Sequence, residues 1–227
     1  MTHPVPSVYR AMIGLGQGLF GALRLRPAPK GLEHLPSSGG AVLAITHFGY
    51  LDFALVQWVL WRRHRRWIRF LVTVRAFEHP VSGPLLRAMQ HIPVDREAGA
   101  GGYRASIKAL RDGHLVGVFP EGQVTGTWEV LPCAGGAARM ASAAGAPLIP
   151  IAVWGGHRVL TRTHRFSVRA AAGATISVRI GAPLEVPRRL ADDAGRWLRQ
   201  HLVALMDEAQ RSYPDRPHRP QDDWWQV

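Results

Sequence analysis

Residues 41–61 have the sequence AVLAITHFGYLDFALVQWVLW, a short apolar run followed by a turn and then by a longer apolar run. The first run, Ala41 to Ile45, is continuous and follows the Ser-Ser-Gly-Gly stretch at 37–40, a pattern typical of a buried strand. Phe53 to Trp61 has the length and composition of a helix. We therefore expect His47 at a strand-to-helix crossing, where α/β proteins tend to place their chemistry.

His47 and Asp52 form a candidate proton-transfer pair. On a regular helix an offset of five residues turns through about 500°, so the two side chains would not share a face. They can meet if His47 lies in the turn and Asp52 lies in the first helical turn. In that geometry the carboxylate fixes the imidazole tautomer and stabilises the imidazolium that forms when His47 takes a proton. A histidine near a helix start is more often a polar surface or cap residue, so the pair needs support from the rest of the chain.

Three further blocks follow this one along the chain. Ile92 to Arg96 ends one apolar run, Phe119 to Gly122 follows another, and Ala146 to Ile151 opens a third. Together with Thr46 to Asp52, these blocks resemble the glycerolipid acyltransferase family in their order and spacing. The 1-acylglycerol-3-phosphate O-acyltransferases are typical of that family. The resemblance extends over roughly residues 32–181.

The resemblance implies acyl transfer in phospholipid biosynthesis. A fatty acyl group would pass from acyl-CoA or acyl carrier protein to the hydroxyl of a lysophospholipid-type acceptor. It implies His47 as the general base and Asp52 as the partner that orients it. The acceptor would attack directly, without an acyl-enzyme on serine or cysteine. No metal is implied, and no cofactor other than the acyl donor as co-substrate.

The resemblance also assigns substrate-binding residues. Glu121 and Gly122 fall in the block that implies acceptor binding, where a carboxylate accepts hydrogen bonds and a glycine lets the backbone approach. Arg96 would hold a phosphate of the acceptor or of coenzyme A, because a guanidinium is a planar, bidentate donor.

The chain departs from the family pattern at positions that bear on the acceptor. Val124 stands where the family has an arginine that contacts the acceptor phosphate, and Cys133 to Gly136 occupies the region of a common lysine. Thr46 and Gly49 replace an asparagine and a serine of the first block. The loss of charge-assisted contacts leaves the phosphate on the acceptor open. Three arginines are candidates to supply the missing charge: Arg75, Arg139 and Arg158.

Two alternatives therefore stand beside lysophospholipid acylation. One is acyl transfer to a lipid acceptor without a phosphate, and the other is a non-catalytic member that binds lipid or an anionic membrane. The intact pair, together with Glu121 and Arg96, favours catalysis, because a binding module has no need of a proton-transfer pair.

Length and composition limit the choice of partners. The 227 residues, 47% of them hydrophobic, suit one domain with a sizeable core. A net charge of +12 favours anionic partners such as phospholipid head groups or coenzyme A phosphates. Nucleic acid is not expected, because no stacking platform or fold signature supports it. Cys133 is the single cysteine, which excludes an internal disulfide, and with no histidine beside it we interpret it as an incidental thiol.

Residues 1–30 are predicted to associate with a membrane. Val5 to Arg26 is apolar, contains four glycines and is too short to span a bilayer, so as a helix it needs a surface to pack on. Trp58 to Trp67 mixes tryptophans with arginines and is either a second interfacial anchor or a solvated helix cap. We expect both segments near the mouth of the His47 cleft, on a peripheral protein at the cytoplasmic face of the cell membrane.

Strands alternate with helices along the chain, which predicts an α/β domain over residues 31–212 with a mainly parallel central sheet flanked by helices. The N-terminal segment is expected as an amphipathic helix. Further strands are expected at 67–74, 91–94, 115–119, 148–154 and 175–180, and further helices at 84–89, 103–112, 136–144 and 190–205. A loop is expected at 27–40, a flexible hinge at 99–102, and a disordered tail from 213 to 227.

Overall fold

A seven-stranded sheet lies at the centre of the computed structural model, which describes residues 4–95, 99–127, 129–162, 165–187 and 193–214. Its strands are β1 (Arg26–Lys30), β2 (Ala41–Ile45), β3 (Ile68–Thr73), β4 (Ile92–Val94), β5 (Leu115–Val118), β6 (Leu148–Trp154) and β7 (Thr175–Ile180). The spatial order is β1-β7-β6-β2-β5-β3-β4, and every neighbouring pair is parallel except β6 and β7. The prediction of a mainly parallel α/β sheet is confirmed.

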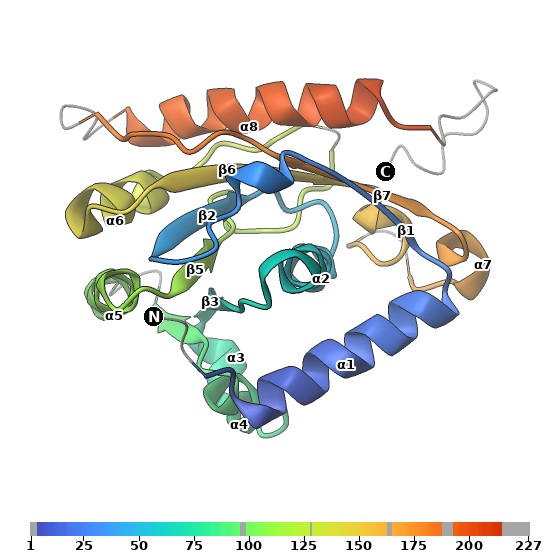
Figure 1. Cartoon of the computed structure of the whole chain (residues 1–227), viewed down its shortest axis with the longest axis horizontal. Helices are drawn as coiled ribbons and strands as arrows, with labels where there is room; N and C mark the ends of the chain where they lie inside the picture. Colours follow the sequence, from blue (N-terminus) through green and yellow to red (C-terminus); the bar gives the residue numbers. More distant parts are fainter. Residues whose placement is uncertain (1–3, 96–98, 128, 163–164, 188–192, 215–227) are drawn as a thin grey trace.

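Helices cover both faces of this sheet. They are α1 (Ser7–Ala22), α2 (Asp52–His64), α3 (Val74–Glu78), α4 (Ser82–Ala88), α5 (Ala100–Arg111), α6 (Gly136–Ala144), α7 (Val168–Ala171) and α8 (Ala194–Arg211), with short 3-10 helices η1 (Leu32–His34) and η2 (Gly156–Arg158). Figure 1 shows α6 and α8 on one side of the sheet and α1 and α2 on the other. The molecule is thus a three-layer α/β sandwich.

β2 lies in the middle of the sheet and is buried on both faces. Leu43 and Ile45 pack in the core under α1 and α2, whereas Val42 and Ala44 pack in the core under α5, α6 and α8. This alternation follows from the two-residue period of a strand that lies between two helical layers. It explains why the sequence shows a continuous apolar run here.

The N-terminal helix α1 packs against the body of the domain. Tyr9, Ile13 and Phe20 are buried on its inner side. The single hydroxyl proton of Tyr9 is shared between two acceptors, Oε1 of Gln57 at 2.9 Å and the carbonyl of Ile68 at 2.8 Å. The predicted amphipathic helix is therefore confirmed, and its inner face belongs to the fold.

Five strands end at the same edge of the sheet. Because β2 to β6 run parallel to one another, the residues that follow each of them meet there. His47 follows β2, Asp95 follows β4, and Glu121 follows β5. The carboxyl edge of the sheet is where ligands bind in folds of this class.

Two local predictions are wrong because contacts distant in sequence decide them. The loop expected at 27–40 begins instead with β1, which pairs in parallel with β7. The flexible hinge expected at 99–102 lies mostly inside α5, where Gly102 is buried so closely that a Cβ would come within 2.8 Å of the Pro93 carbonyl oxygen. There glycine serves close packing, not flexibility.

The tryptophan and arginine cluster at 58–67, for which an interfacial anchor and a solvated helix cap were both open, lies away from the place predicted for it. Trp58 and Trp67 are only 8% and 5% exposed, so their rings are core residues. The guanidinium of Arg66 donates hydrogen bonds to the carbonyls of Pro36, Gly39 and Gly113, which precede β2 and β5. The cluster therefore lies at the amino edge of the sheet, and its predicted place at the mouth of the His47 cleft is wrong.

Tyr213, the first residue of the predicted tail, belongs to the fold. Tyr213 is buried, and its hydroxyl donates a 2.7 Å hydrogen bond to the carbonyl of Thr175. Positions 215–227, and Leu190 of the predicted C-terminal helix, lie outside the described residues. Within the described part of the chain, no helix has both the length and the apolar character that crossing a bilayer requires.

Candidate active site

The loop that carries His47 leaves β2 through a threonine that extends the sheet pairing. The amide of Thr46 donates to the carbonyl of Ile151, and its side-chain hydroxyl accepts from the amide of Val153, both at 3.0 Å. Thr46 is fully buried, so this hydroxyl satisfies a backbone donor that has no access to water. The threonine that stands in place of the family asparagine thus anchors the start of the loop.

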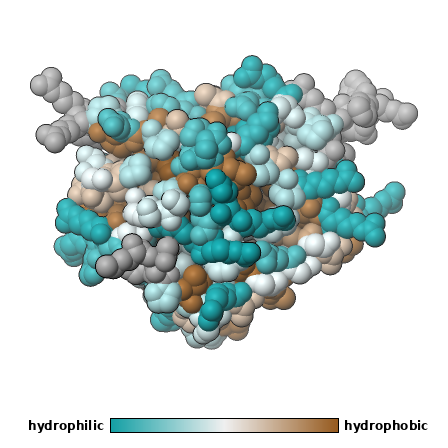
Figure 2. Space-filling view, viewed as in Figure 1, coloured by the Kyte–Doolittle hydropathy of each residue, from teal (hydrophilic) through white to brown (hydrophobic). Residues whose placement is uncertain are grey.

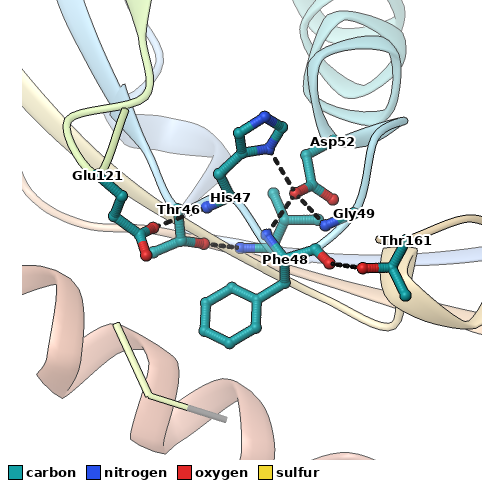
Figure 3. A network of polar contacts seen from close by, with 8 residues as sticks. Thr46, His47, Phe48, Gly49, Asp52, Glu121 and Thr161 are labelled. Atoms are coloured by element: carbon teal, nitrogen blue, oxygen red, sulfur yellow. Dashed lines mark hydrogen bonds and ion pairs between the residues drawn. The ribbon is translucent and has the colours of Figure 1, made fainter. Parts of the chain in front are cut away.

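Asp52 organises the turn after His47. Its Oδ2 atom accepts hydrogen bonds from the amides of Phe48 and Gly49, each at 2.8 Å (Figure 3). Asp52 is the first residue of α2 and is completely buried. A negative charge at a helix N-terminus is stabilised by the helix dipole and by the free amides of the turn.

The same carboxylate oxygen faces the imidazole. Nδ1 of His47 lies 3.4 Å from Oδ2 of Asp52, long for a hydrogen bond but within the range that catalytic contacts show before substrate binds. Burial raises the pKa of Asp52, while the hydrogen bonds from His47 and from the two amides oppose that rise by stabilising the carboxylate. The predicted geometry, with His47 in the turn and Asp52 in the first helical turn, is present.

Glu121 lies on the other side of His47. Its Oε1 atom accepts a hydrogen bond from the amide of His47 at 2.8 Å, and its Oε2 atom accepts one from the amide of Leu131 at 2.9 Å. The side chain is 9% exposed. Burial raises the pKa of Glu121, and these two amide donors oppose that rise. Both oxygens are therefore engaged with the backbone.

Residues 156–161, which follow β6, pack against the loop that carries His47. The amide of Tyr50 donates to the carbonyl of Leu160, and the hydroxyl of Thr161 donates to the carbonyl of Phe48, both at 3.0 Å. A Cβ on Gly49 would come within 2.7 Å of the backbone of Gly156. Glycine therefore replaces the family serine where two backbones meet.

A cavity of about 1120 Å³ opens beside the imidazole. Its apolar lining comes from strand ends and from the facing helices: Phe53, Phe70, Leu71, Val72, Leu86, Val94, Val118, Phe119 and Met140. The ring of His47 stacks on that of Phe119, with 4.0 Å between centroids and 22° between planes. A cavity of this size with a largely apolar lining suits a hydrocarbon chain.

The predicted binding residues fall in different places. Gly122 lines the cavity beside Glu121. Arg75 is exposed on α3 and is not among the residues that line the cavity, so the structure does not bring it to the site. Val124 is 7% exposed and does not line the cavity either. Arg96 lies outside the described residues.

Several groups at the site carry little signal in the sequence. Arg139 and Tyr103 line the cavity from α6 and α5, and of the two only Arg139 is a candidate from the sequence. Thr161 follows β6 without any recognisable motif, although the Gly155-Gly156 pair is typical of close backbone approach. Cys133 is as inert as expected, because burial and the charge of Glu121 raise the pKa of its thiol to about 12.

The chain resembles known proteins in sequence. A family model described as Acyltransferase matches residues 26–154. The 1-acyl-sn-glycerol-3-phosphate acyltransferase of Bacillus subtilis (strain 168) is 34% identical over 124 residues, which cover 54% of this chain and 60% of that protein. The match thus spans less than two thirds of that relative.

A solved structure shares the fold. The crystal structure of the 1-acyl-sn-glycerophosphate (LPA) acyltransferase PlsC from Thermotoga maritima superposes with a TM-score of 0.74 over 91% of this chain and 81% of that chain, at 16% sequence identity. The family model includes His47, Asp52 and Glu121 and covers more than half of the chain. The chain therefore belongs to the acyltransferase family.

Proposed function

We propose that this protein transfers a fatty acyl group from acyl-CoA or acyl carrier protein to the hydroxyl of a lysophospholipid-type acceptor. The observation that carries the proposal is the His47–Asp52 pair, whose imidazole lines a largely apolar cavity. The name of the Bacillus subtilis relative supports an acceptor of the 1-acylglycerol-3-phosphate type.

In the proposed reaction His47 is the general base. With its Nδ1 proton directed at Asp52, the imidazole keeps a lone pair on Nε2, which points away from Asp52 (Figure 3). The acceptor oxygen attacks the thioester carbonyl carbon and forms the C–O bond while Nε2 takes the hydroxyl proton. The C–S bond then breaks, and the departing thiolate takes that proton from the imidazolium. The products are an ester and a free thiol.

Thiol release tests this proposal. Purified protein is given acyl-CoA or acyl carrier protein with a panel of lysophospholipids and neutral monoacylglycerols. General-base help is typically worth 10²–10⁴ in rate, so His47→Ala should lose at least about a hundredfold. His79→Ala, at an exposed histidine outside the cavity lining, is the control. Retention of more than about a tenth of turnover by His47→Ala would refute the assignment, and no thiol release with any acceptor would favour a lipid-binding role.

The acceptor head group distinguishes the proposed function from a second candidate, acyl transfer to a lipid without a phosphate. Buried Val124 removes the family arginine, which favours an acceptor without phosphate. Among the described residues that line the cavity, however, Arg139 carries the only permanent positive charge. We propose that Arg139 contacts the acceptor phosphate from the first turns of α6.

Arg139→Ala decides between the two acceptors. Loss of one charge-assisted hydrogen bond, ~1.5 kcal/mol at the low end of its range, should lower the preference for lysophosphatidic acid over its dephosphorylated monoacylglycerol about tenfold. Arg75→Ala removes an equal charge outside the cavity and should leave the preference unchanged. An unchanged ratio in Arg139→Ala would favour the acceptor without phosphate.

A further inference from the structure

Glu121 has a contact pattern that acceptor binding does not require. Each of its two carboxylate oxygens accepts a backbone amide, that of His47 at 2.8 Å and that of Leu131 at 2.9 Å. The two amides are ten residues or more from Glu121 in sequence, so a single side chain joins two separate parts of the chain. Carboxylates that accept amide hydrogens make hydrogen bonds roughly twice as strong as neutral ones.

The segment that carries Glu121 also holds the other backbone group of His47. The carbonyl of His47 accepts a 2.8 Å hydrogen bond from the amide of Thr125. Both backbone polar groups of His47 are therefore bound to residues 121–125. The peptide plane before His47 is held by Glu121, whereas the plane after it is held by Thr125 at its carbonyl and by Asp52 at the Phe48 amide.

The ring itself has weaker constraints. Its contact with Asp52 is 3.4 Å long, and it stacks on the ring of Phe119. Phe119 is two residues before Glu121, so the same segment again sets that neighbour. The place of the imidazole relative to a substrate in the cavity thus depends on residues 119–125 as well as on Asp52 of α2.

We propose that Glu121 is a positioning residue, which fixes the backbone of His47 through its two amide hydrogen bonds, and is not a ligand of the acceptor. This inference rests on the proposed function, because it names the group that orients the base of that reaction. It predicts that Glu121 acts on the rate of the chemical step and not on acceptor affinity. A displacement of about 1 Å at a catalytic group can cost a hundredfold in rate.

Glu121→Gln is the direct test. We call the two hydrogen bonds from the amides of His47 and Leu131 to Glu121 the clamp. The carboxamide oxygen of glutamine can accept one amide, but its NH2 group then faces the other amide donor, so one bond of the clamp is lost. We expect kcat to fall about ten- to a hundredfold, while the KM for the acceptor stays within about twofold. Glu121→Asp keeps the charge but is one methylene shorter, so it cannot bridge both amides and should show the same pattern.

Two controls separate charge and binding from position. Glu129→Gln removes an exposed carboxylate eight residues after Glu121 and should leave kcat and the acceptor KM unchanged. Arg139→Ala should raise the acceptor KM without the loss in kcat. Circular dichroism and melting temperature check that each variant is folded. A raised acceptor KM at unchanged kcat in Glu121→Gln, full activity in Glu121→Asp, or failure of both variants to fold would each overturn the positioning role.

A readout that needs no turnover tests the clamp independently. In ¹⁵N-labelled protein the amide proton of His47 donates to a carboxylate, and Glu121→Gln should change its chemical shift and hydrogen exchange, whereas Glu129→Gln should not. If the wild type releases no thiol but this amide responds, the proposed function fails and the clamp stands. If the wild type is active and the amide does not respond, the clamp itself is refuted.

Discussion

At His47 the backbone is held more firmly than the side chain. Its amide and its carbonyl each make a 2.8 Å hydrogen bond, whereas its ring lies 3.4 Å from Asp52. Catalytic hydrogen bonds are often long without substrate and tighten in the complex. Such tightening requires a fixed backbone and a ring that can move towards Asp52.

Another histidine near the cavity has a role in stability. His91 lines the cavity but is buried, and its Nδ1 atom accepts a 3.1 Å hydrogen bond from the amide of Phe70. Burial, helped by the charge of Arg69, lowers the pKa of His91 from 6.5 to about 4. The folded protein thus favours the neutral ring, while the unfolded chain takes up a proton more readily.

This difference in the pKa of His91 between the folded and unfolded chains predicts that part of the free energy of unfolding depends on pH. The contribution is complete above pH 6.5 and is lost as the pH falls towards 4, by about 3 kcal/mol if the whole shift is expressed. Asp52 and Glu121, whose pKa burial raises, change stability in the opposite sense, but they are common to both proteins in a comparison. Denaturant unfolding of wild type and His91→Asn at several pH values between 4 and 7 isolates this contribution. Equal pH dependence in the two proteins would contradict it.

At the scale of elements, the sequence predicts those helices and strands that a local pattern of residues determines. β6, α6 and β7 occur at the expected residues, because each is an apolar or alanine-rich run with clear ends. β1 was missed because two prolines in five residues argue against a strand. Its register places Arg26 and Ala28 opposite β7 through hydrogen bonds such as Arg26 N to Ala174 O, so Pro27 and Pro29 fall on the outer side. Prolines there leave an edge that lacks amide donors, which discourages pairing with another chain.

The candidate site likewise contains a local contact, which the sequence predicts, and contacts between distant residues, which it does not. His47 and Asp52 are five residues apart, so a local argument could bring them together. The bond from Glu121 to His47 crosses 74 residues, and the one from Thr161 to Phe48 crosses 113. No periodicity in one sequence shows such contacts, because they depend on which strands are neighbours in the sheet. Resemblance placed Glu121 at the site, but only the fold gives it both amide partners.

The segment after β6, residues 155–161, gives the prediction at this scale. It packs against the back of the His47 loop, and the hydroxyl of Thr161 donates to the carbonyl of Phe48. Thr161→Val has nearly the same shape but leaves that buried carbonyl without its donor, at a cost of about 1–3 kcal/mol. We expect lower thermal stability together with a kcat reduced about three- to tenfold. Thr161→Ser keeps the hydroxyl and should retain most of both, and equal losses in the two variants would assign the effect to packing of the methyl group.

At the scale of the whole molecule, one group of exposed large apolar side chains lies on α1 and near α7. Leu15 and Leu19 on α1 are 66% and 46% exposed, and Phe166 and Val168 near α7 are 47% and 62% exposed. The two places are adjacent, because the amide of Gly173 donates to the carbonyl of Leu23 just after α1. Figure 2 shows hydrophobic residues at the surface along the lower edge of the molecule, where Figure 1 places α1 and α4.

The glycines of α1 belong to this surface. A Cβ at Gly14 or Gly18 would meet nothing within 4 Å, so these residues face away from the protein body. Each costs a helix in water ~1 kcal/mol relative to alanine, and the buried side alone must hold α1 in place. With the net charge of +12, an exposed apolar helix face supports the expectation of a peripheral protein on an anionic membrane.

Vesicle binding tests this orientation with a matched pair of variants. Leu15→Glu with Leu19→Glu places two charges on the outer face of α1 at a four-residue spacing, where they would have to enter the interface. Gln200→Glu with Ala204→Glu places two charges at the same spacing on the exposed side of α8, which covers the opposite face of the sheet. We expect the α1 variant to bind vesicles containing anionic phospholipid at least about tenfold more weakly than wild type, because it loses apolar burial as well as net charge. The α8 variant carries the same change in net charge and should bind only slightly more weakly, by an amount that vanishes at high salt. Equal losses in the two variants would mean that net charge alone attracts the protein to lipid, and an undiminished α1 variant would place the membrane on another face.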